Sequence, residues 1–305
     1  MKRLEQIVPS QELAGIRVIV TGCGYRPLQQ VFCDIVTGEP SHDPIFVCGK
    51  EMKMNIGSAT AGILARAGAN VHMVSTSEDK LRNLKASIDN IIEDNTQIEF
   101  SAVDLSDEET VRKFVSNLPT DKPFYWVQAL GLSGGAYQVK DDNPYLPIEK
   151  IDPKLMEAEL SVLTSTQKMM RELLPKFRQQ KETRVAIITS MSAIRGYSLG
   201  GTHCAAKAAV DRYANSAMLA LYRQPENIFI TTIRPGGVDT GMYDNPKVQE
   251  AINTVSDEYM GQYRKHQTYM PPTVIGEAVK FIFTSLAHIP SLNIVARGQF
   301  PNEGS

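Results

Sequence analysis

Short runs of consecutive apolar residues recur along this chain, and stretches of helical length separate them. Continuous apolar runs are typical of parallel strands whose two faces are both covered by helices. Their regular alternation predicts an α/β fold with one doubly wound sheet of seven parallel strands flanked by helices, in a single domain over residues 1–305. The expected strands are 17–21, 71–74, 97–105, 124–129, 185–188, 228–233 and 292–295, and the expected helices are 55–68, 78–94, 107–118, 153–180, 205–221 and one that starts at 271.

The alternation is broken once, after the first strand, where residues 26–54 precede the helix that should follow at once. Two strand-like runs, 31–36 and 45–48, flank a turn rich in Pro and Gly and predict an inserted β-hairpin. His42 and Asp43 are expected to be residues of that turn. Two interpretations of the insertion stay open: a surface decoration that extends the sheet or an interface, and a flap over bound phosphates or a contact with a partner.

Polar side chains gather where the run 185–188 ends, at the carboxyl end of a predicted strand. Ser190 follows that strand directly, and Lys207 lies on the next helix, after a Gly-rich loop. Open α/β sheets bind their ligands at this edge, outside the carboxyl ends of the strands. We therefore expect Ser190 and Lys207 to face one cleft.

The spacing of these residues resembles the catalytic set of the short-chain dehydrogenase/reductase family. In that family a strand-end Ser is followed after thirteen residues by a Tyr and after four more by a Lys. Ser190 and Lys207 occupy the outer positions here, and His203 occupies the position of the Tyr. The resemblance implies a Rossmann fold, catalytic roles for Ser190, His203 and Lys207, and a homodimer or homotetramer in which the helix ending near 221 packs against its copy.

Motifs elsewhere in the chain resemble the nucleotide site of the family. Joined across the insertion, Thr21-Gly22-Cys23-Gly24-Tyr25 and Asn55-Ile56-Gly57 look like its glycine fingerprint, with Asn55 in place of the second Gly. Asn accepts a positive φ more readily than most residues, so it suits that turn. The resemblance implies that the following residues bind the cofactor: Thr21, Gly22, Gly24, Asn55, Ile56, Gly57, Ser75, Thr76, Asp104, Leu105, Gly131, Lys207, Pro235, Gly236, Val238 and Thr240.

The second predicted strand ends in Ser75-Thr76-Ser77 and carries no acidic residue there. A site specific for NAD places a carboxylate at this point to hold the ribose 2′-hydroxyl. Without that carboxylate nothing repels a 2′-phosphate, and the three hydroxyls, with Lys80 or Arg26 nearby, can bind one. The predicted cofactor is NADP(H) in preference to NAD(H).

The sequence departs from the family at positions that carry chemistry. Val162 stands where the helix 153–180 should carry a catalytic Asn, and Gln128-Ala129 replaces an Asn pair. A second cation beside Lys207 and an oxidised nicotinamide is disfavoured, so we expect the His203 imidazole to be mostly neutral, a base but a poor acid. The substitute proton donors are Tyr197, Tyr137 and Tyr243.

The leading hypothesis is an NADP(H)-dependent oxidoreductase for a carbonyl or alcohol substrate, with an atypical Ser-His-Lys site. One alternative is a catalytically degenerate relative that binds NADP(H) as a regulatory or scaffold protein. Another is a non-redox enzyme, a dehydratase or isomerase, that uses His203 as a base. Residues 241–270, with several Tyr and Met, resemble the variable substrate lid of the family, and core packing is the competing interpretation.

Composition narrows the class of partner. The 305 residues are 42% hydrophobic with a formal net charge of −2, so no basic surface for nucleic acid or an anionic membrane is expected. The four cysteines lack the spacing of a metal site, and no metal is expected. The first residues lack the apolar run of a secretory signal, and no stretch approaches the roughly 18 apolar residues of a membrane span. We expect a soluble cytoplasmic protein that acts on a small molecule.

Overall fold

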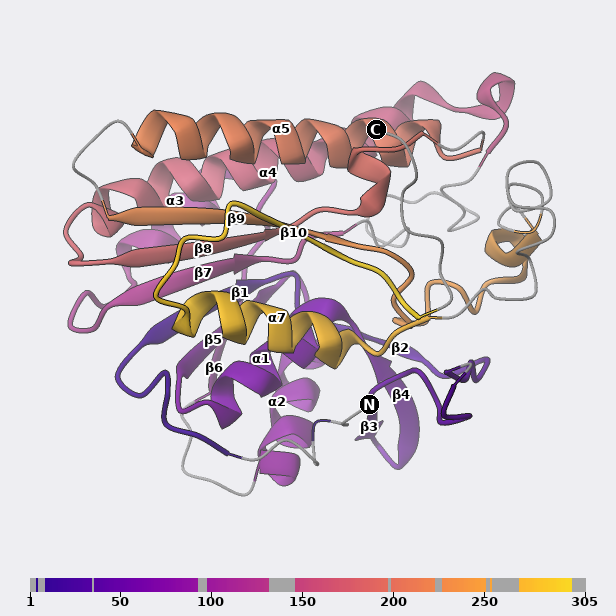
Figure 1. The fold of residues 1–305 in the computed structure, drawn as a ribbon, viewed down its shortest axis with the longest axis horizontal. Helices are drawn as coiled ribbons and strands as arrows, with labels where there is room; N and C mark the ends of the chain where they lie inside the picture. The colour runs from indigo at the N-terminus through magenta and orange to yellow at the C-terminus, as the bar shows by residue number, and fades with distance from the viewer. Residues whose placement is uncertain are drawn as a thin grey trace.

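The computed structural model describes residues 4, 9–34, 36–92, 98–131, 146–196, 199–222, 227–250, 253 and 269–297. A seven-stranded sheet runs through the middle of this part of the chain, in the order β10-β9-β8-β7-β1-β5-β6 (Figure 1). Every neighbouring pair in it is parallel, which confirms the predicted sheet. Its strands are β1 (Arg17–Thr21), β5 (Asn70–Ser75), β6 (Ile98–Ala102), β7 (Phe124–Gln128), β8 (Thr183–Ile188), β9 (Ile228–Pro235) and β10 (Ser291–Ile294).

Helices cover both faces of this sheet and make the fold doubly wound. Helices α1, α2 and α7 lie on one face, and α3, α4 and α5 lie on the other (Figure 1). Each face has its own buried hydrophobic cluster, and the second cluster includes the fully buried Trp126. None of the helices described is long and apolar enough to cross a bilayer. The helices are α1 (Ile56–Arg66), α2 (Glu78–Ile92), α3 (Glu108–Ser116), α4 (Pro153–Phe177), α5 (Gly201–Tyr222) and α7 (Pro272–Thr284), with the 3₁₀ turns η3 (Ile148–Lys150) and η4 (Met191–Ala193).

The insertion after β1 folds into a second, antiparallel sheet of three strands in the order β2-β4-β3. Tyr25 pairs with Met54, and the N–H of Asn55 donates to the carbonyl of Gly24 at 3.1 Å. The first and last residues of the insertion therefore lie side by side, which joins the two halves of the glycine fingerprint. The strands are β2 (Tyr25–Pro27), β3 (Pro44–Val47) and β4 (Lys50–Met54).

The insertion contains a hairpin, but the predicted pairing of 31–36 with 45–48 across the turn between them is wrong. Strands β3 and β4 form it, joined by Cys48 and Gly49 with φ values of 51° and 75°, the left-handed pair that a tight hairpin turn needs. In the described residues the run 31–36 contributes one isolated bridge and no strand. Phe32 instead packs its ring against that of Tyr269, with centroids 4.7 Å apart. The three strands form a sheet of their own and do not extend the main sheet.

Buried polar groups bond the inserted sheet to the body of the protein. The carboxylate of Asp43 accepts from the N–H and the hydroxyl of Thr273 at 2.7 and 3.2 Å, and so satisfies the start of α7. The hydroxyl of Ser87 on α2 donates to the carbonyl of Phe46 at 2.8 Å. His42 and Asp43 are both buried. Asp43 anchors the insertion to α7, whereas His42 contacts Glu51 of β4 within the insertion, with Nε2 and Oε1 2.9 Å apart.

Candidate functional site

Two glycines shape the turn between β1 and α1. Gly22 has a φ of +89°, and a Cβ on it would lie 2.5 Å from the carbonyl oxygen of Ala129. A Cβ on Gly57 would lie 2.6 Å from the carbonyl oxygen of Gly22. Both contacts are too short for a real side chain, so only glycine fits either position. Backbone N–H groups of such a turn can approach a pyrophosphate directly.

Asn55 completes this turn as the N-cap of α1. Its φ is −88°, so the positive φ that we expected is wrong. Its Oδ1 accepts from the N–H groups of Ser58 and Gly24 at 2.9 and 3.2 Å, and its Nδ2 donates to the carbonyl of Gly22 at 2.8 Å. Hydrogen bonds from one side chain thus replace the second glycine of the fingerprint. The start of α1 directs its dipole at the turn, which suits an anion.

Other predicted cofactor residues follow the ends of strands along one edge of the sheet. Thr21 pairs with both Val74 and Gln128, so the carboxyl ends of β1, β5 and β7 coincide. Ser75, the last residue of β5, is half-buried, and Thr76 just beyond it is exposed. The hydroxyl of Thr21 is buried and bonds to β7 within the sheet. Of these three residues, Ser75 and Thr76 are the ones that solvent reaches.

Asp104, Leu105 and Gly131 continue this edge. The Oδ1 of Asp104 accepts from the N–H and the hydroxyl of Ser106 at 2.9 and 2.7 Å, which holds the exposed carboxylate beyond the end of β6. Leu105 is buried in the core, and Gly131 is exposed beyond β7. A Cβ on Gly131 would meet no described residue within 4 Å, so packing does not require glycine there.

Backbone bonds hold the Pro-Gly motif after β9 at the same edge. The N–H of Gly236 donates to the carbonyl of Ile294 at 2.7 Å, and Val238 forms a parallel bridge with the chain just before α7. The N–H of Thr240 donates to the carbonyl of Val238 at 2.9 Å. Pro235 is the buried last residue of β9. The segment is therefore fixed beside the ends of β9 and β10.

The three predicted catalytic residues lie just after β8 and on α5. The Oγ of Ser190 accepts from the N–H of Ser192 at 3.1 Å. The Nζ of Lys207 donates to the carbonyl of Leu130 at 3.2 Å, so the ammonium reaches from α5 to the carboxyl end of β7. His203 precedes Lys207 by one helical turn, and the two side chains therefore share a face of α5.

A buried carboxylate that the sequence analysis missed lies beside these residues. Glu159 on α4 is 2% exposed, and its Oε2 lies 3.8 Å from Nδ1 of His203. Burial lowers the pKa of Lys207, and the charge of Glu159 opposes that change. Glu159 lies about one helical turn before Val162, the position expected to carry Asn, so the two residues share a face of α4. This shared face was the sequence signal that could have placed Glu159 near the site. Val162 itself is buried in the core.

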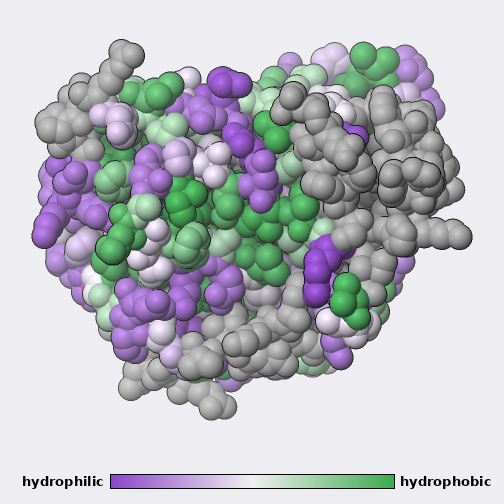
Figure 2. Space-filling model, in the orientation of Figure 1, coloured by the Kyte–Doolittle hydropathy of each residue, from purple (hydrophilic) through white to green (hydrophobic). Residues whose placement is uncertain are grey.

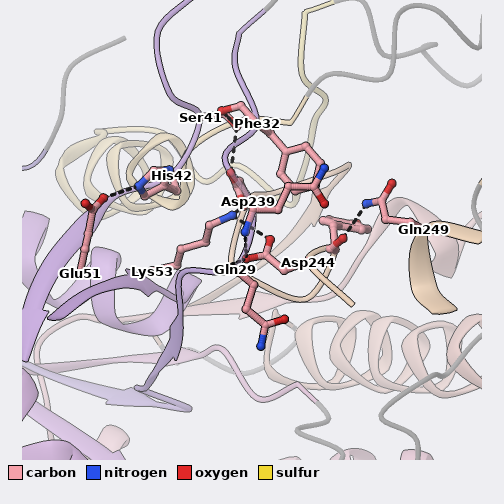
Figure 3. Close-up of polar contacts among 11 residues, drawn as sticks. Gln29, Phe32, Ser41, His42, Glu51, Lys53, Asp239, Asp244 and Gln249 are labelled. Carbon is pink, nitrogen blue, oxygen red and sulfur yellow. Dashed lines mark hydrogen bonds and ion pairs between the residues drawn. The ribbon is translucent and has the colours of Figure 1, made fainter. Parts of the chain in front are cut away.

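A second missed feature is a buried ion cluster between the inserted sheet and the segment after β9 (Figure 3). The Nζ of Lys53 on β4 lies 2.7 Å from Oδ1 of Asp239 and 2.8 Å from Oδ1 of Asp244. Oδ2 of Asp239 accepts from the hydroxyl of Ser41 at 3.0 Å, and the ammonium lies 5.0 Å from the ring centroid of Phe32. None of the three charged side chains is more than 1% exposed. We call Lys53, Asp239 and Asp244 the insertion cluster.

Several predictions concern residues outside the described part of the chain. Tyr137 and Tyr197 lie there, as does most of the predicted lid, residues 241–270, and the single domain stays a prediction. Tyr243 is described, and its ring stacks on Tyr269 with centroids 4.3 Å apart. Among the described residues, no three or more His, Cys, Asp and Glu side chains are grouped to hold a metal ion.

Known proteins resemble this chain in sequence and in fold. The 3-oxoacyl-[acyl-carrier-protein] reductase FabG of Rickettsia conorii is 27% identical over 236 residues, which cover 76% of this chain and 86% of that protein. An NADPH-bound short chain oxidoreductase of Pseudomonas aeruginosa, described as containing an atypical catalytic center, has a TM-score of 0.69 at 16% identity and covers 98% of this chain and 100% of that one.

A further solved structure has the same fold. The L-sorbose reductase of Gluconobacter frateurii, complexed with NADPH and L-sorbose, has a TM-score of 0.66 at 16% identity, over 94% of this chain and 97% of that one. At such identity these two structures show a shared fold alone. The family model described as short chain dehydrogenase matches residues 47–251, more than half of the sequence, and the chain therefore belongs to the short-chain dehydrogenase family.

Proposed function

We propose that the protein is an NADP(H)-dependent oxidoreductase that interconverts a carbonyl and an alcohol at a site formed by Ser190, His203 and Lys207. The observation that carries the proposal is the position of Lys207. Its Nζ lies 3.2 Å from the carbonyl oxygen of Leu130, at the sheet edge that also holds the Gly22 turn. An ammonium there can contact both a ribose hydroxyl and the reacting atoms.

The residues of the glycine turn fit a dinucleotide. Gly22 and Gly57 leave bare backbone where any side chain would clash, and the start of α1, capped by Asn55, favours an anion. Ser75 and Thr76 offer hydroxyls where an NAD site would carry a carboxylate, which favours a 2′-phosphate. The Pseudomonas and Gluconobacter structures contain NADPH, which supports the same choice. When bound, the nicotinamide supplies or accepts the hydride.

Each catalytic side chain has its own role in this proposal. The hydroxyl of Ser190 donates a hydrogen bond to the carbonyl oxygen of the substrate. The ammonium of Lys207 holds the ribose and stabilises negative charge near the reacting oxygen. In reduction the protonated His203 gives a proton to the forming alkoxide, and in oxidation the neutral His203 removes the proton of the alcohol.

Removing the imidazole tests this assignment. His203→Ala is expected to lower turnover by about 10²–10⁴-fold, the usual contribution of a positioned acid or base, and to retain NADPH binding. NADPH oxidation with a panel of aldehydes and ketones between about pH 5 and 8 measures turnover, and NADPH fluorescence measures binding. His288→Ala is the matched control, because that ring bonds the carbonyl of Ile230 at 2.9 Å. Ile230 lies near the amino end of β9, whereas the proposed site lies at the carboxyl ends of the strands. Wild-type turnover in His203→Ala would overturn the role.

A catalytically degenerate protein that binds NADP(H) for regulation is the second candidate. Two positions favour it: residue 203 is His where the family has Tyr, and Val162 packs in the core where the family has Asn. Tight NADPH binding without turnover, in the wild type and in His203→Tyr, would support this candidate. Turnover with no change in nicotinamide absorbance would instead support a dehydratase or an isomerase.

We propose further that the chain forms a homodimer or a homotetramer. Leu219 and Tyr222 are exposed on α5, the helix that the family resemblance assigns to an interface. Figure 2 shows hydrophobic residues gathered on another face, over α7 and β10, and Phe281 of α7 is exposed. Contiguous exposed apolar surface marks protein contacts. Light scattering is expected to give twice or four times the mass of one chain, and a monomer would contradict the proposal.

A further inference from the structure

Glu159 is a buried carboxylate that needs a physical explanation. It lies on α4, and its side chain is directed at α5. Its Oε1 is buried and has no hydrogen-bond partner among the described residues. Removing a carboxylate from water is unfavourable unless cations or donors compensate it. A carboxyl group buried in this way beside proposed catalytic residues points to a task in the site.

Two side chains of α5 that can carry positive charge lie near Glu159. Nδ1 of His203 is 3.8 Å from Oε2, the distance of an ion pair rather than of a hydrogen bond. Burial lowers the pKa of Lys207, and the negative charge of Glu159 acts against this. From the sequence we expected Lys207 to keep His203 neutral. That expectation did not include Glu159, an acidic side chain 3.8 Å from the His203 ring.

We propose that Glu159 is the positioning residue of His203, an inference that rests on the proposed acid-base role of His203. The carboxylate accepts the Nδ1–H of the imidazole, which fixes the tautomer and leaves Nε2 to exchange a proton with the substrate. A shift of about 1 Å brings the pair to hydrogen-bond distance. The same carboxylate stabilises the imidazolium, so His203 can serve as the acid of carbonyl reduction.

The proposed step balances once the cofactor is included. In reduction the carbonyl carbon would accept the hydride that NADPH supplies, leaving NADP⁺, the C=O π bond breaks, and the oxygen takes a proton from Nε2 of the His203 imidazolium. His203 becomes neutral and keeps its proton on Nδ1. Glu159 remains a carboxylate throughout. Oxidation of the alcohol runs each transfer in reverse.

The charge of Glu159 can be tested without any substrate. In Glu159→Gln the amide keeps the shape and removes the charge, so the fraction of His203 rings that carry a proton on Nδ1 in the neutral form is expected to fall. Nitrogen-15 histidine NMR of the cofactor-free protein measures this tautomer fraction, and since the chain has five His, His203→Ala identifies the signal. Glu157→Gln is the matched control, because Glu157 is exposed on the same helix, and its His203 tautomer fraction is expected to equal that of the wild type.

Glu159→Asp is a second variant that keeps the charge but withdraws it from the imidazole. Its His203 tautomer fraction is expected between those of the wild type and Glu159→Gln, and thermal melts establish that each variant is folded. Should Glu159→Gln fail to fold, the comparison of Glu159→Asp with the wild type decides alone. An unchanged His203 tautomer fraction in the folded variants overturns the proposal.

Kinetics separate this inference from the proposed function. In Glu159→Gln the kcat for carbonyl reduction is expected to fall by about tenfold, with KM changed less than about twofold. Turnover with an unchanged His203 tautomer fraction overturns the role of Glu159 and leaves the function intact. A changed tautomer fraction without turnover of any substrate overturns the function and leaves the ion pair intact.

Discussion

Lys53→Met is expected to lower the free energy of unfolding by about 3–5 kcal/mol, the usual cost of removing one partner of a buried ion pair. Methionine nearly fills the volume of lysine, so the loss comes from charge: Asp239 and Asp244 lose the cation that lies 2.7 and 2.8 Å from them. Denaturant unfolding measures the change, and the melting temperature is expected to fall by about 10 °C. Lys154→Met, at an exposed position of α4, is the control, with an expected effect of at most about 0.5 kcal/mol.

The loss in Lys53→Met is expected to depend on pH. Burial raises the pKa of Asp239, and the hydrogen bond and charge of Lys53 act against this. A carboxyl whose pKa is raised on folding contributes stability that is present at acid pH and lost as the pH rises through the folded-state pKa. Without Lys53 the effect of burial on the pKa of Asp239 dominates. The loss of unfolding free energy in Lys53→Met is therefore expected to be smaller near about pH 5 than near about pH 8.

Removing all three charges of the insertion cluster checks this explanation. Lys53→Met combined with Asp239→Asn and Asp244→Asn is expected to recover most of the stability lost in Lys53→Met, because no uncompensated charge stays buried. An equal loss at both pH values, or a triple variant as unstable as the single one, would show that the charge of Lys53 is not what stabilises the contact.

Lys207→Met is expected to lower kcat/KM for carbonyl reduction by about 10³-fold, because one substitution removes both the proposed ribose contact and the proposed charge near the reacting oxygen. NADPH oxidation with the same panel of carbonyls measures the loss. NADPH affinity is expected to fall by about tenfold, the effect of one lost hydrogen bond from a charged group. Lys154→Met is again the control, and far-UV circular dichroism establishes that the variant is folded. Wild-type turnover in a less stable Lys207→Met would make this lysine a structural cation and contradict its proposed role.

The main sheet could be predicted because its strands are buried on both faces and therefore appear as continuous apolar runs. Strand β1 has the predicted bounds, and β8 begins two residues before the predicted 185–188. The insertion was less predictable. Its run 31–36 has the composition of a strand, but a short apolar run fits a packed loop equally well. Burial of Lys53 depends on partners 186 and 191 residues further along the chain, which no local pattern reveals.

The candidate site likewise contains residues that local motifs predict and residues that only the folded structure reveals. The Ser190-His203-Lys207 spacing and the glycines are local motifs, so they could be found from sequence. Asn55 was placed by analogy with a glycine of positive φ, although Asn is among the favoured N-cap residues and precedes a predicted helix. Glu159 was missed because glutamates of long helices are almost always solvated. Its burial follows from the packing of α4 against α5, which sequence periodicity does not specify.

The inserted sheet also fixes the distance between the glycine turn and the segment after β9. Strand β4 passes directly into Asn55 and the glycine turn, while Lys53, two residues earlier, is bonded to Asp239 and Asp244. A Cβ on Gly241 would lie 3.0 Å from Cβ of Arg26, so the two segments also touch without any charge between them. Parting them would require separating buried ions, so the inserted sheet keeps the segment after β9 beside the strand that leads into the glycine turn.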